Sequence, residues 1–360
     1  MITREQKEYL LPKAYNAAIR AGAAILDIYN SGGPIDVDIK SDRSPITVAD
    51  RLAHSVIREY LGQTRIPLLS EEGREMLYAE RKDWDLFWMV DPLDGTVEFI
   101  KGNGEFTVNI ALMADNRPVF GVIYVPYRKR IYFSDSDLGA FRSCNTEADP
   151  EAEYVYAEIT AGAEALPLTD CRTRPLKVAV SRSHSDGETA RHLEELRKRH
   201  PDAEVLQQGS SYKLCLIAEG SVDYYPRTTE TYEWDTAAGE SIIALAGGSI
   251  YSLDVTRPYA PRSGTTRSRW STPASPAAAN GSVTEPRQSP SQPYGDVPSG
   301  TSPYLIPVSA TVQPFRFKPA PTITGPPPPV SVRANSFRNR RRTQYRTTRS
   351  PLRRVRASPE

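Results

Sequence analysis

Two stretches near the start of the chain carry apolar residues at helical spacing. Between Leu10 and Tyr29 the apolar residues recur every three or four positions, and the polar segment NSGG follows them. A second pattern of this kind begins near residues 47–50, after the structure-breaking pair Ser44 and Pro45. This spacing predicts two amphipathic helices.

The stretches that follow have the patterns of strands. IPLLSEEG predicts a short strand that ends in acidic residues, and WDLFWMV is apolar almost without a break, as expected of a strand buried on both faces. Residues 105–143 then alternate between apolar and polar positions, with turn signals at DNRP and YRKR. This period of two predicts an antiparallel meander.

Residues 176–253 return to a mixed pattern of strands and helices. LKVAVSRSHSD predicts a strand that ends in a polar loop, and ETARHLEELRKRH predicts a helix. EVLQQGSSYKLCLIAEGSVDYYPR predicts a strand, a loop, a helix and a short strand. A last helix is predicted to begin at Asp235 and to end at the Gly247–Gly248 pair. The pattern as a whole indicates an α/β body with acids and small polar residues at strand ends, where open sheets place their sites.

Composition divides the chain near residue 255. Residues 256–360 hold 17 Lys and Arg against 3 Asp and Glu, a formal charge of +14, and they contain 19 of the 31 prolines. Residues 1–255 carry a formal charge of −13. Because so polar and proline-rich a segment buries too little apolar surface to offset its ordering entropy, we predict an ordered body over 1–255 and a disordered tail over 256–360.

The sequence also gives an expectation for the protein's location. The first residues lack the pattern of a signal peptide, and no apolar stretch approaches the ~20 residues that span a bilayer. We therefore expect a cytoplasmic protein, with peripheral attachment at the inner face of the membrane as a variant of that location.

Acidic residues gather where predicted strands end and predicted helices begin. The set comprises Asp50, Glu71, Glu72, Asp91, Asp94 and Asp235. A single Asp in the first turn of a helix is more often a cap than a ligand. Asp91 and Asp94 differ, because a buried strand runs directly into them and the turn in DPLDGT brings the second carboxylate back beside the first.

Two carboxylates this close would repel each other unless one takes up a proton or cations neutralise them. No His or Cys stands near them, and the three cysteines of the chain form no metal-binding spacing. Ligands that are all oxygen suit a hard ion, and Mg²⁺ is the first choice. The acids therefore predict metal-assisted phosphoryl chemistry.

Three segments, in order along the chain, resemble the inositol monophosphatase superfamily. They are LLSEEG, DPLDGTVEFIKGNGEFTVNIAL and EWDTAAGESIIALAGG, and the resemblance extends from about residue 5 to about residue 253. Within that superfamily, EFIK and NGEFTVNIAL resemble the 3′(2′),5′-bisphosphate nucleotidases of sulfate assimilation, which hydrolyse 3′-phosphoadenosine 5′-phosphate to AMP. The resemblance implies a mixed α/β (α+β) fold, layered as an αβαβα sandwich, for the metal-dependent phosphatase body.

The resemblance also implies two or more Mg²⁺ ions as cofactor, with this chain's residues in matching roles. The residues that match the ligands of the first ion are Glu71, Asp91 and the carbonyl of Leu93. Those that match the ligands of the second ion are Asp91, Asp94 and Asp235. Thr96, with Asp50, matches the pair that orients and deprotonates the attacking water.

Residues for substrate recognition are predicted with less support from motifs. They are Gly95 and Thr96 beside the phosphate, Ser181 and His184 in SRSHSD, Ser210 and Lys213 in GSSYK, and Arg227. Lys213 and Arg227 would neutralise the second phosphate of a bisphosphate nucleotide. Two alternatives stay open: both cations are ordinary surface charges, and His184 is a structural histidine.

Other functions and origins also stay open from the sequence. The same chemistry would serve an inositol monophosphate or fructose bisphosphate phosphatase. A protein of another class would bind phosphate without turnover, or bind nucleic acid through its basic tail alone. The tail matches no element of the family, so it stems from an altered reading frame, is an appended nucleic-acid-binding arm, or has no function. The oligomeric state is not indicated.

Overall fold

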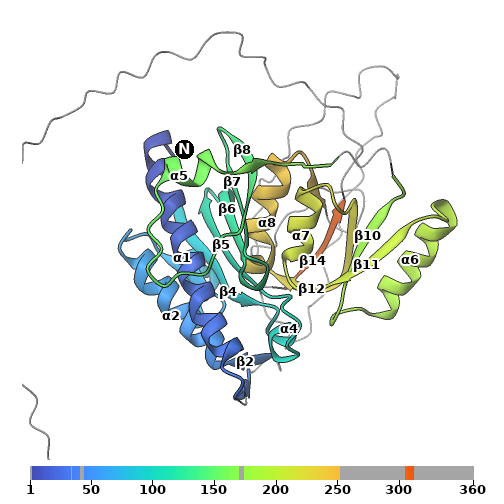
Figure 1. Cartoon of the computed structure of the whole chain (residues 1–360), viewed down its shortest axis with the longest axis horizontal. Helices are drawn as coiled ribbons and strands as arrows, with labels where there is room; N and C mark the ends of the chain where they lie inside the picture. The colour runs from blue at the N-terminus through green and yellow to red at the C-terminus, as the bar shows by residue number, and fades with distance from the viewer. Residues whose placement is uncertain (1, 34, 41–43, 170–173, 252–304, 312–360) are drawn as a thin grey trace, which may run out of the picture. The chain divides into compact units, whose positions relative to one another are not determined.

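Helices and sheets alternate in five layers in the computed structural model, which describes residues 2–33, 35–40, 44–169, 174–251 and 305–311 (Figure 1). The layers are helices α1 and α2, a seven-stranded sheet, helices α7 and α8, a five-stranded sheet, and helix α6. Their bounds are α1 Arg4–Asn30, α2 Val48–Gly62, α6 Gly187–Arg199, α7 Tyr212–Ala218 and α8 Glu233–Leu245. This order confirms the αβαβα sandwich expected from the sequence.

The larger sheet has the strand order β3-β4-β5-β6-β7-β8-β9 and contains the predicted meander. Its bounds are β3 Leu68–Ser70, β4 Leu86–Asp94, β5 Thr107–Ala114, β6 Arg117–Val125, β7 Arg130–Asp135, β8 Gly139–Cys144 and β9 Glu164–Ala165. Strands β3 and β4 are parallel, and every later pair in this sheet is antiparallel. Shorter elements are the hairpin of β1 Val37–Ile39 and β2 Pro45–Thr47, and the helices α3 Tyr78–Arg81, α4 Thr96–Ile100, η1 Pro126–Arg128 and α5 Tyr156–Ala161.

Strand β4 is buried on both faces, as its continuous apolar run predicts. Phe87 and Met89 join the cluster under α7 and α8, whereas Trp88 and Val90 join the cluster under α1 and α2. The alternation follows from the period of two in a strand, so both helical layers clamp the same strand. Its carboxyl end therefore has little freedom, and that end carries the acids Asp91 and Asp94.

The five-stranded sheet contains a strand from the region for which the sequence predicted disorder. Its order is β11-β10-β12-β14-β13, with bounds β10 Lys177–Ser181, β11 Glu204–Gln208, β12 Tyr224–Tyr232, β13 Ser249–Tyr251 and β14 Leu305–Thr311. Strand β14 pairs antiparallel with both β12 and β13, so it completes the sheet at this position. The predicted disordered tail includes these seven residues, which the structure describes as a strand, and the rest of 256–360 lies outside the described residues.

Two helix starts differ from the sequence predictions. Helix α1 begins at Arg4, six residues earlier than the apolar pattern, because Thr3 and Gln6 form a capping box in an exposed first turn. Helix α8 begins at Glu233 rather than at Asp235, because Asp235 is its third residue and accepts a hydrogen bond from the Tyr232 amide at 3.1 Å. Among the residues that the structure describes, no helix is both long and apolar enough to cross a membrane.

Candidate active site

Twelve of the thirteen residues that the sequence predicted for metal binding, catalysis or substrate binding line a single pocket of about 490 Å³. They come from the ends of β3, β4 and β10, the starts of α4, α7 and α8, and strand β12. The lining includes Glu71, Asp91, Leu93, Asp94, Gly95, Thr96, Ser181, His184, Ser210, Lys213, Arg227 and Asp235. The thirteenth residue, Asp50, lies behind the wall and contacts Thr96. The volume suits a small-molecule ligand.

The turn after β4 places the two aspartates on the pocket wall. Asp91 still pairs with Asn109 of β5, but the register shifts before Asp94 pairs with Thr107. Within this irregularity the Leu93 amide donates to Asp91 Oδ1 at 3.1 Å, which closes a tight local turn. The chain therefore leaves the sheet between the two acids, as the DPLDGT motif predicts.

Gly95 is required at the start of helix α4. Its φ of +92° is in the left-handed region that favours glycine. A Cβ at this position would lie 3.1 Å from both the Glu105 carbonyl oxygen and Ser210 Cβ. The missing side chain thus lets the loop before α7 approach the turn that carries Asp94 and Thr96.

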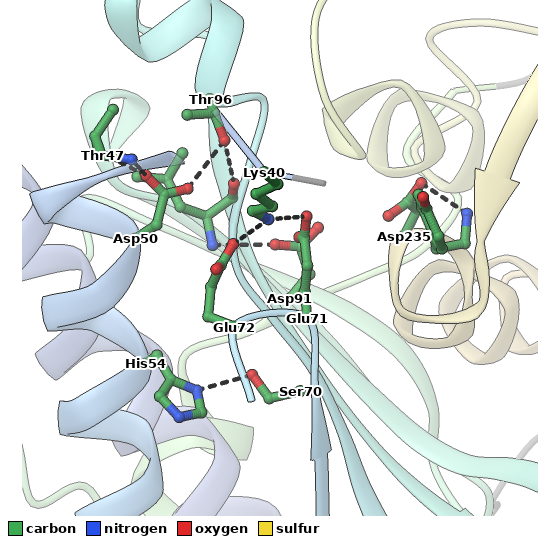
Figure 2. A network of polar contacts seen from close by, with 12 residues as sticks. Lys40, Thr47, Asp50, His54, Ser70, Glu71, Glu72, Asp91, Thr96 and Asp235 are labelled. Carbon is green, nitrogen blue, oxygen red and sulfur yellow. Dashed lines mark hydrogen bonds and ion pairs between the residues drawn. The ribbon is translucent and has the colours of Figure 1, made fainter. Parts of the chain in front are cut away.

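Thr96 and Asp50 form a hydrogen-bonded relay at the pocket wall (Figure 2). The Thr96 hydroxyl donates to Asp50 Oδ1 at 2.9 Å. Asp50 is 1 % exposed, and its second oxygen accepts from the Thr47 amide at 2.7 Å and the Thr47 hydroxyl at 2.6 Å. Asp50 is therefore both the capping acid of α2 and the partner of Thr96, so the two readings of a helix-start aspartate hold together here.

A lysine that the sequence analysis did not single out lies on the two acids after β3. Lys40 Nζ is 2.7 Å from Glu71 Oε1 and also contacts Glu72, as Figure 2 shows. Glu72 directs its carboxylate to this ammonium and does not line the pocket. Lys40 thus supplies part of the positive charge that Glu71 requires.

Asp94 and Asp235 are fixed by groups on the other side of the pocket. The Ser211 amide donates to Asp94 Oδ2 at 2.5 Å, and the Ser211 hydroxyl bonds to the same oxygen and contacts the Asp235 carbonyl oxygen at 2.8 Å. The Asp235 carboxylate accepts from the Thr231 hydroxyl at 2.6 Å. Figure 2 shows Asp235 set apart from Glu71 and Asp91 across the site.

Burial and mutual repulsion raise the pKa values of the pocket acids. Burial raises the pKa of Glu71 to about 7, against the pull of Lys40 and with Asp235 adding to the rise. Burial and the neighbouring Asp94 raise the pKa of Asp235 to about 6. Burial, followed by the charges of Glu71 and Asp94, also raises the pKa of Asp91. The site therefore holds more negative charge than its own cations neutralise.

The donor set fits a hard divalent cation. All candidate ligands are carboxylate or carbonyl oxygens, and the excess negative charge is what such a cation would compensate. In the described ranges, no three acids, histidines or cysteines yet surround one point as a closed metal cage. Lys40 bonds to Glu71, and Ser211 and Thr231 bond to Asp94 and Asp235.

The raised pKa values predict that metal binding stabilises the protein most at alkaline pH. Glu71 and Asp235 keep protons in the folded state between about pH 4 and 7, where the unfolded chain has lost them, so their contribution to stability falls as pH rises. Saturating Mg²⁺ removes this penalty. Calorimetry is expected to show a Mg²⁺-induced rise in Tm that is about 5 °C larger at pH 8 than at pH 5.5.

Glu240 supplies the internal control for that measurement. Burial raises the pKa of Glu240 to about 7 as well, but this residue of α8 does not line the pocket. Glu240 therefore contributes to the change of Tm with pH in EDTA, but it does not change the rise in Tm that Mg²⁺ causes. A Mg²⁺ effect that is equal at both pH values would show that the pocket acids are not the metal ligands.

Cationic and polar groups line the same pocket as the acids. Lys213 is 1 % exposed and donates to the carbonyl oxygens of Ser210 at 2.7 Å and Gln208 at 3.1 Å. The alternative that Lys213 is an ordinary surface charge is therefore wrong. Arg227 is half-buried beside Tyr225, and burial together with Arg227 lowers the pKa of His184. The pocket thus contains cationic side chains as well as acids.

Further lining residues were not found from the sequence. They are Ser44, Pro45, Val97, Glu98 and Tyr232. Glu98 stands in the EFIK segment, two residues after Thr96, so its place on the first turn of α4 was within reach of the motif. The loop residues before α2 and Tyr232 carry no such signal, because their approach depends on the packing of separate elements.

Comparison with known sequences connects this pocket to a phosphatase family. The family model described as the inositol monophosphatase family matches residues 6–284. The 3′(2′),5′-bisphosphate nucleotidase CysQ of Salmonella typhimurium is 39% identical over 256 residues, which cover 70% of this chain and 95% of that protein. CysQ of Escherichia coli strain K12 is 38% identical over 244 residues, which cover 67% and 90%.

Solved structures show the same similarity. The crystal structure of CysQ from Bacteroides thetaiotaomicron, a bacterial member of the inositol monophosphatase family, has 45% sequence identity and a TM-score of 0.61, covering 68% of this chain and 89% of that chain. The extragenic suppressor protein SuhB from Bartonella henselae has 25% identity and a TM-score of 0.54, covering 68% and 87%. The family match extends about thirty residues past the end of the resemblance seen in the sequence motifs.

Proposed function

The chain belongs to the inositol monophosphatase family, and from this premise we propose that it is a Mg²⁺-dependent 3′(2′),5′-bisphosphate nucleotidase. It removes the 3′-phosphate of 3′-phosphoadenosine 5′-phosphate and releases AMP. The identity of 38–39% with CysQ proteins over two thirds of the chain supports a phosphatase that acts on bisphosphate nucleotides. The metal dependence and the individual steps are supported by the pocket chemistry.

The observation that carries the proposal is the Thr96–Asp50 hydrogen bond at the edge of the acidic pocket. Because the Thr96 hydroxyl donates its hydrogen bond to Asp50, its oxygen can accept a hydrogen bond from a water molecule in the pocket. Asp50 is buried and held by Thr47, so it keeps this orientation. The pair can therefore orient a water and take up its proton as that water attacks phosphorus.

Mg²⁺, when bound, would neutralise the acids and the phosphate oxygens and make the water more acidic. Glu71, Asp91, Asp94, Asp235 and the Leu93 carbonyl are the groups that would hold it.

The cationic side chains in the pocket, Lys213 and Arg227, support a substrate with a second phosphate. Lys213 and Arg227 line the same cavity as the acids, with the polar groups of Ser181, His184 and Ser210 beside them. A second anionic group bound there would gain charge-assisted hydrogen bonds. A substrate with a single phosphate makes no such contacts through a second anionic group, which favours a bisphosphate nucleotide over an inositol monophosphate.

A substrate panel tests this assignment. Full-length protein with Mg²⁺ is expected to hydrolyse adenosine 3′,5′-bisphosphate with a kcat/KM at least about 100-fold above that for inositol 1-phosphate, because charge-assisted contacts to the second phosphate are each worth about 1.5–3 kcal/mol. Fructose 1,6-bisphosphate, which has a second phosphate but no nucleoside, is expected to be hydrolysed more slowly than the nucleotide as well. Phosphate release is measured for each compound at one pH and Mg²⁺ concentration.

The panel also separates the competing readings. A preference for inositol 1-phosphate or fructose bisphosphate would replace the nucleotidase assignment with the corresponding phosphatase. Binding without turnover of any compound would indicate a phosphate-binding protein. The expected cytoplasmic location stays a prediction. Nucleic-acid binding by the basic tail and the origin of that tail also stay predictions, because most of the tail lies outside the described residues.

A further inference from the structure

Glu98 is a buried acid on the pocket wall that the chemistry described above does not use. It lies in the first turn of α4, two residues after Thr96, and is 2 % exposed. Its Oε2 atom is 3.4 Å from the position that a Cβ of Gly95 would occupy. Its carboxylate therefore lies against the turn that carries Asp94 and Thr96, close to the place of the reacting phosphate.

Protein groups leave this carboxylate without a donor. Over the part of the chain that the structure describes, the Glu98 side chain has no hydrogen bond and no salt bridge. The nearby guanidinium of Arg182 is engaged by Glu105, with contacts of 2.7 and 2.8 Å, and the Gly209 amide also donates to Glu105 at 2.7 Å. The neighbouring donors thus serve Glu105 and leave Glu98 facing the pocket.

A carboxylate that faces the pocket and has no protein donor is satisfied by water or by a ligand group that donates a hydrogen bond. Phosphate oxygens cannot supply one, since they are acceptors and would repel it. A sugar hydroxyl can. In a nucleoside 3′-phosphate the 2′-hydroxyl is on the carbon next to the reacting ester, and in a 2′-phosphate the 3′-hydroxyl takes the same relative place. The adenine amine lies at the far end of the nucleoside.

We propose that Glu98 is a specificity-determining residue that accepts a hydrogen bond from the ribose hydroxyl next to the reacting phosphate. This inference rests on the proposed nucleotidase function and deepens it. One acceptor beside Gly95 and Thr96 selects ribonucleotides over deoxyribonucleotides, and it aligns the ester with the Thr96–Asp50 relay.

The test compares adenosine 3′,5′-bisphosphate with its 2′-deoxy analogue on full-length protein with Mg²⁺. The wild type is expected to prefer the ribonucleotide by about tenfold or more in kcat/KM. Glu98→Ala is expected to lower kcat/KM for the ribonucleotide by about 10- to 100-fold and for the deoxy analogue by less than about threefold. Glu98→Gln keeps an acceptor oxygen without the charge, so its kcat/KM for the ribonucleotide is expected to lie between those of the wild type and Glu98→Ala.

Glu59→Ala on the exposed surface of α2 is the matched control and is expected to leave both substrates unchanged. Equal losses on both substrates in Glu98→Ala and Glu98→Gln, or a wild type that is indifferent to the 2′-hydroxyl, would overturn the inference and leave the nucleotidase assignment standing. A wild type that releases no phosphate from the ribonucleotide overturns the proposed function and this inference with it. If Glu98→Ala does not fold, the inference is still tested by Glu98→Gln and by the ratio of the wild-type kcat/KM values for the ribonucleotide and its deoxy analogue.

Discussion

Asp91→Asn is expected to lower Mg²⁺-dependent phosphate release by at least about 10³-fold, equivalent to about 4 kcal/mol of transition-state stabilisation. Asp91 lies near the carboxyl end of the buried strand β4, and its carboxylate interacts with those of Glu71 and Asp94. An amide of the same shape cannot provide the negative charge that would hold a cation there. The folded structure is expected to survive, since the change removes a buried repulsion.

Stability and activity should therefore change in opposite directions. In EDTA at pH 8, Asp91→Asn is expected to unfold at a higher temperature than the wild type, because one fewer charge is buried. Glu240→Gln is the matched control, a buried acid outside the pocket that is expected to keep full activity. Retained Mg²⁺-dependent turnover in Asp91→Asn would exclude Asp91 as a metal ligand.

Thr96→Ala is expected to lower kcat by about 10²- to 10³-fold with little change in KM, because it removes the group that receives the attacking water. Asp50→Asn is expected to cause a loss of similar size, and the double variant should lose little more, since the two residues act as one unit. Asp50→Asn alone is expected to cost about 1 kcal/mol in unfolding free energy, because it weakens the cap of α2.

Thr96→Ser supplies the conservative control, since it keeps the hydroxyl that bonds to Asp50 at 2.9 Å. Its kcat is expected to stay within about fivefold of the wild type. Losses in Thr96→Ala and Asp50→Asn that multiply in the double variant would show that the two residues act independently, which contradicts the relay.

Local patterns predicted most of the strands and helices, because these depend on residues close in sequence, whereas the resemblance to a family implied the layers and most of the pocket residues. The apolar run of β4 fixed its burial, and the turn in DPLDGT fixed the places of Asp91, Asp94 and Thr96. Asp235 was predicted to be the first residue of its helix but is the third, because its capping bond to the Tyr232 amide is visible only from the backbone. The resemblance to a family, rather than periodicity, brought the distant acids into one site.

The parts that could not be predicted depend on contacts between segments far apart in the chain. Lys40 reaches Glu71 from a hairpin whose sequence gives no hint of that contact. Strand β14 belongs to a region whose composition predicts disorder. Seven residues of ordinary β-propensity are too few to change the composition of a region rich in proline and arginine. Glu98 lies within the EFIK motif, but its proposed role in ribose recognition follows only from its burial at the pocket wall without a protein donor.

Phosphorus NMR of full-length protein mixed with adenosine 3′,5′-bisphosphate tests the central claim most directly. With Mg²⁺, the proposed nucleotidase activity predicts that the 3′-phosphate signal disappears, that inorganic phosphate appears in equal amount and that the 5′-phosphate signal stays as AMP. With EDTA in place of Mg²⁺, both original signals should persist. Release of the 5′-phosphate, release that EDTA does not affect, or no release at all would contradict the account.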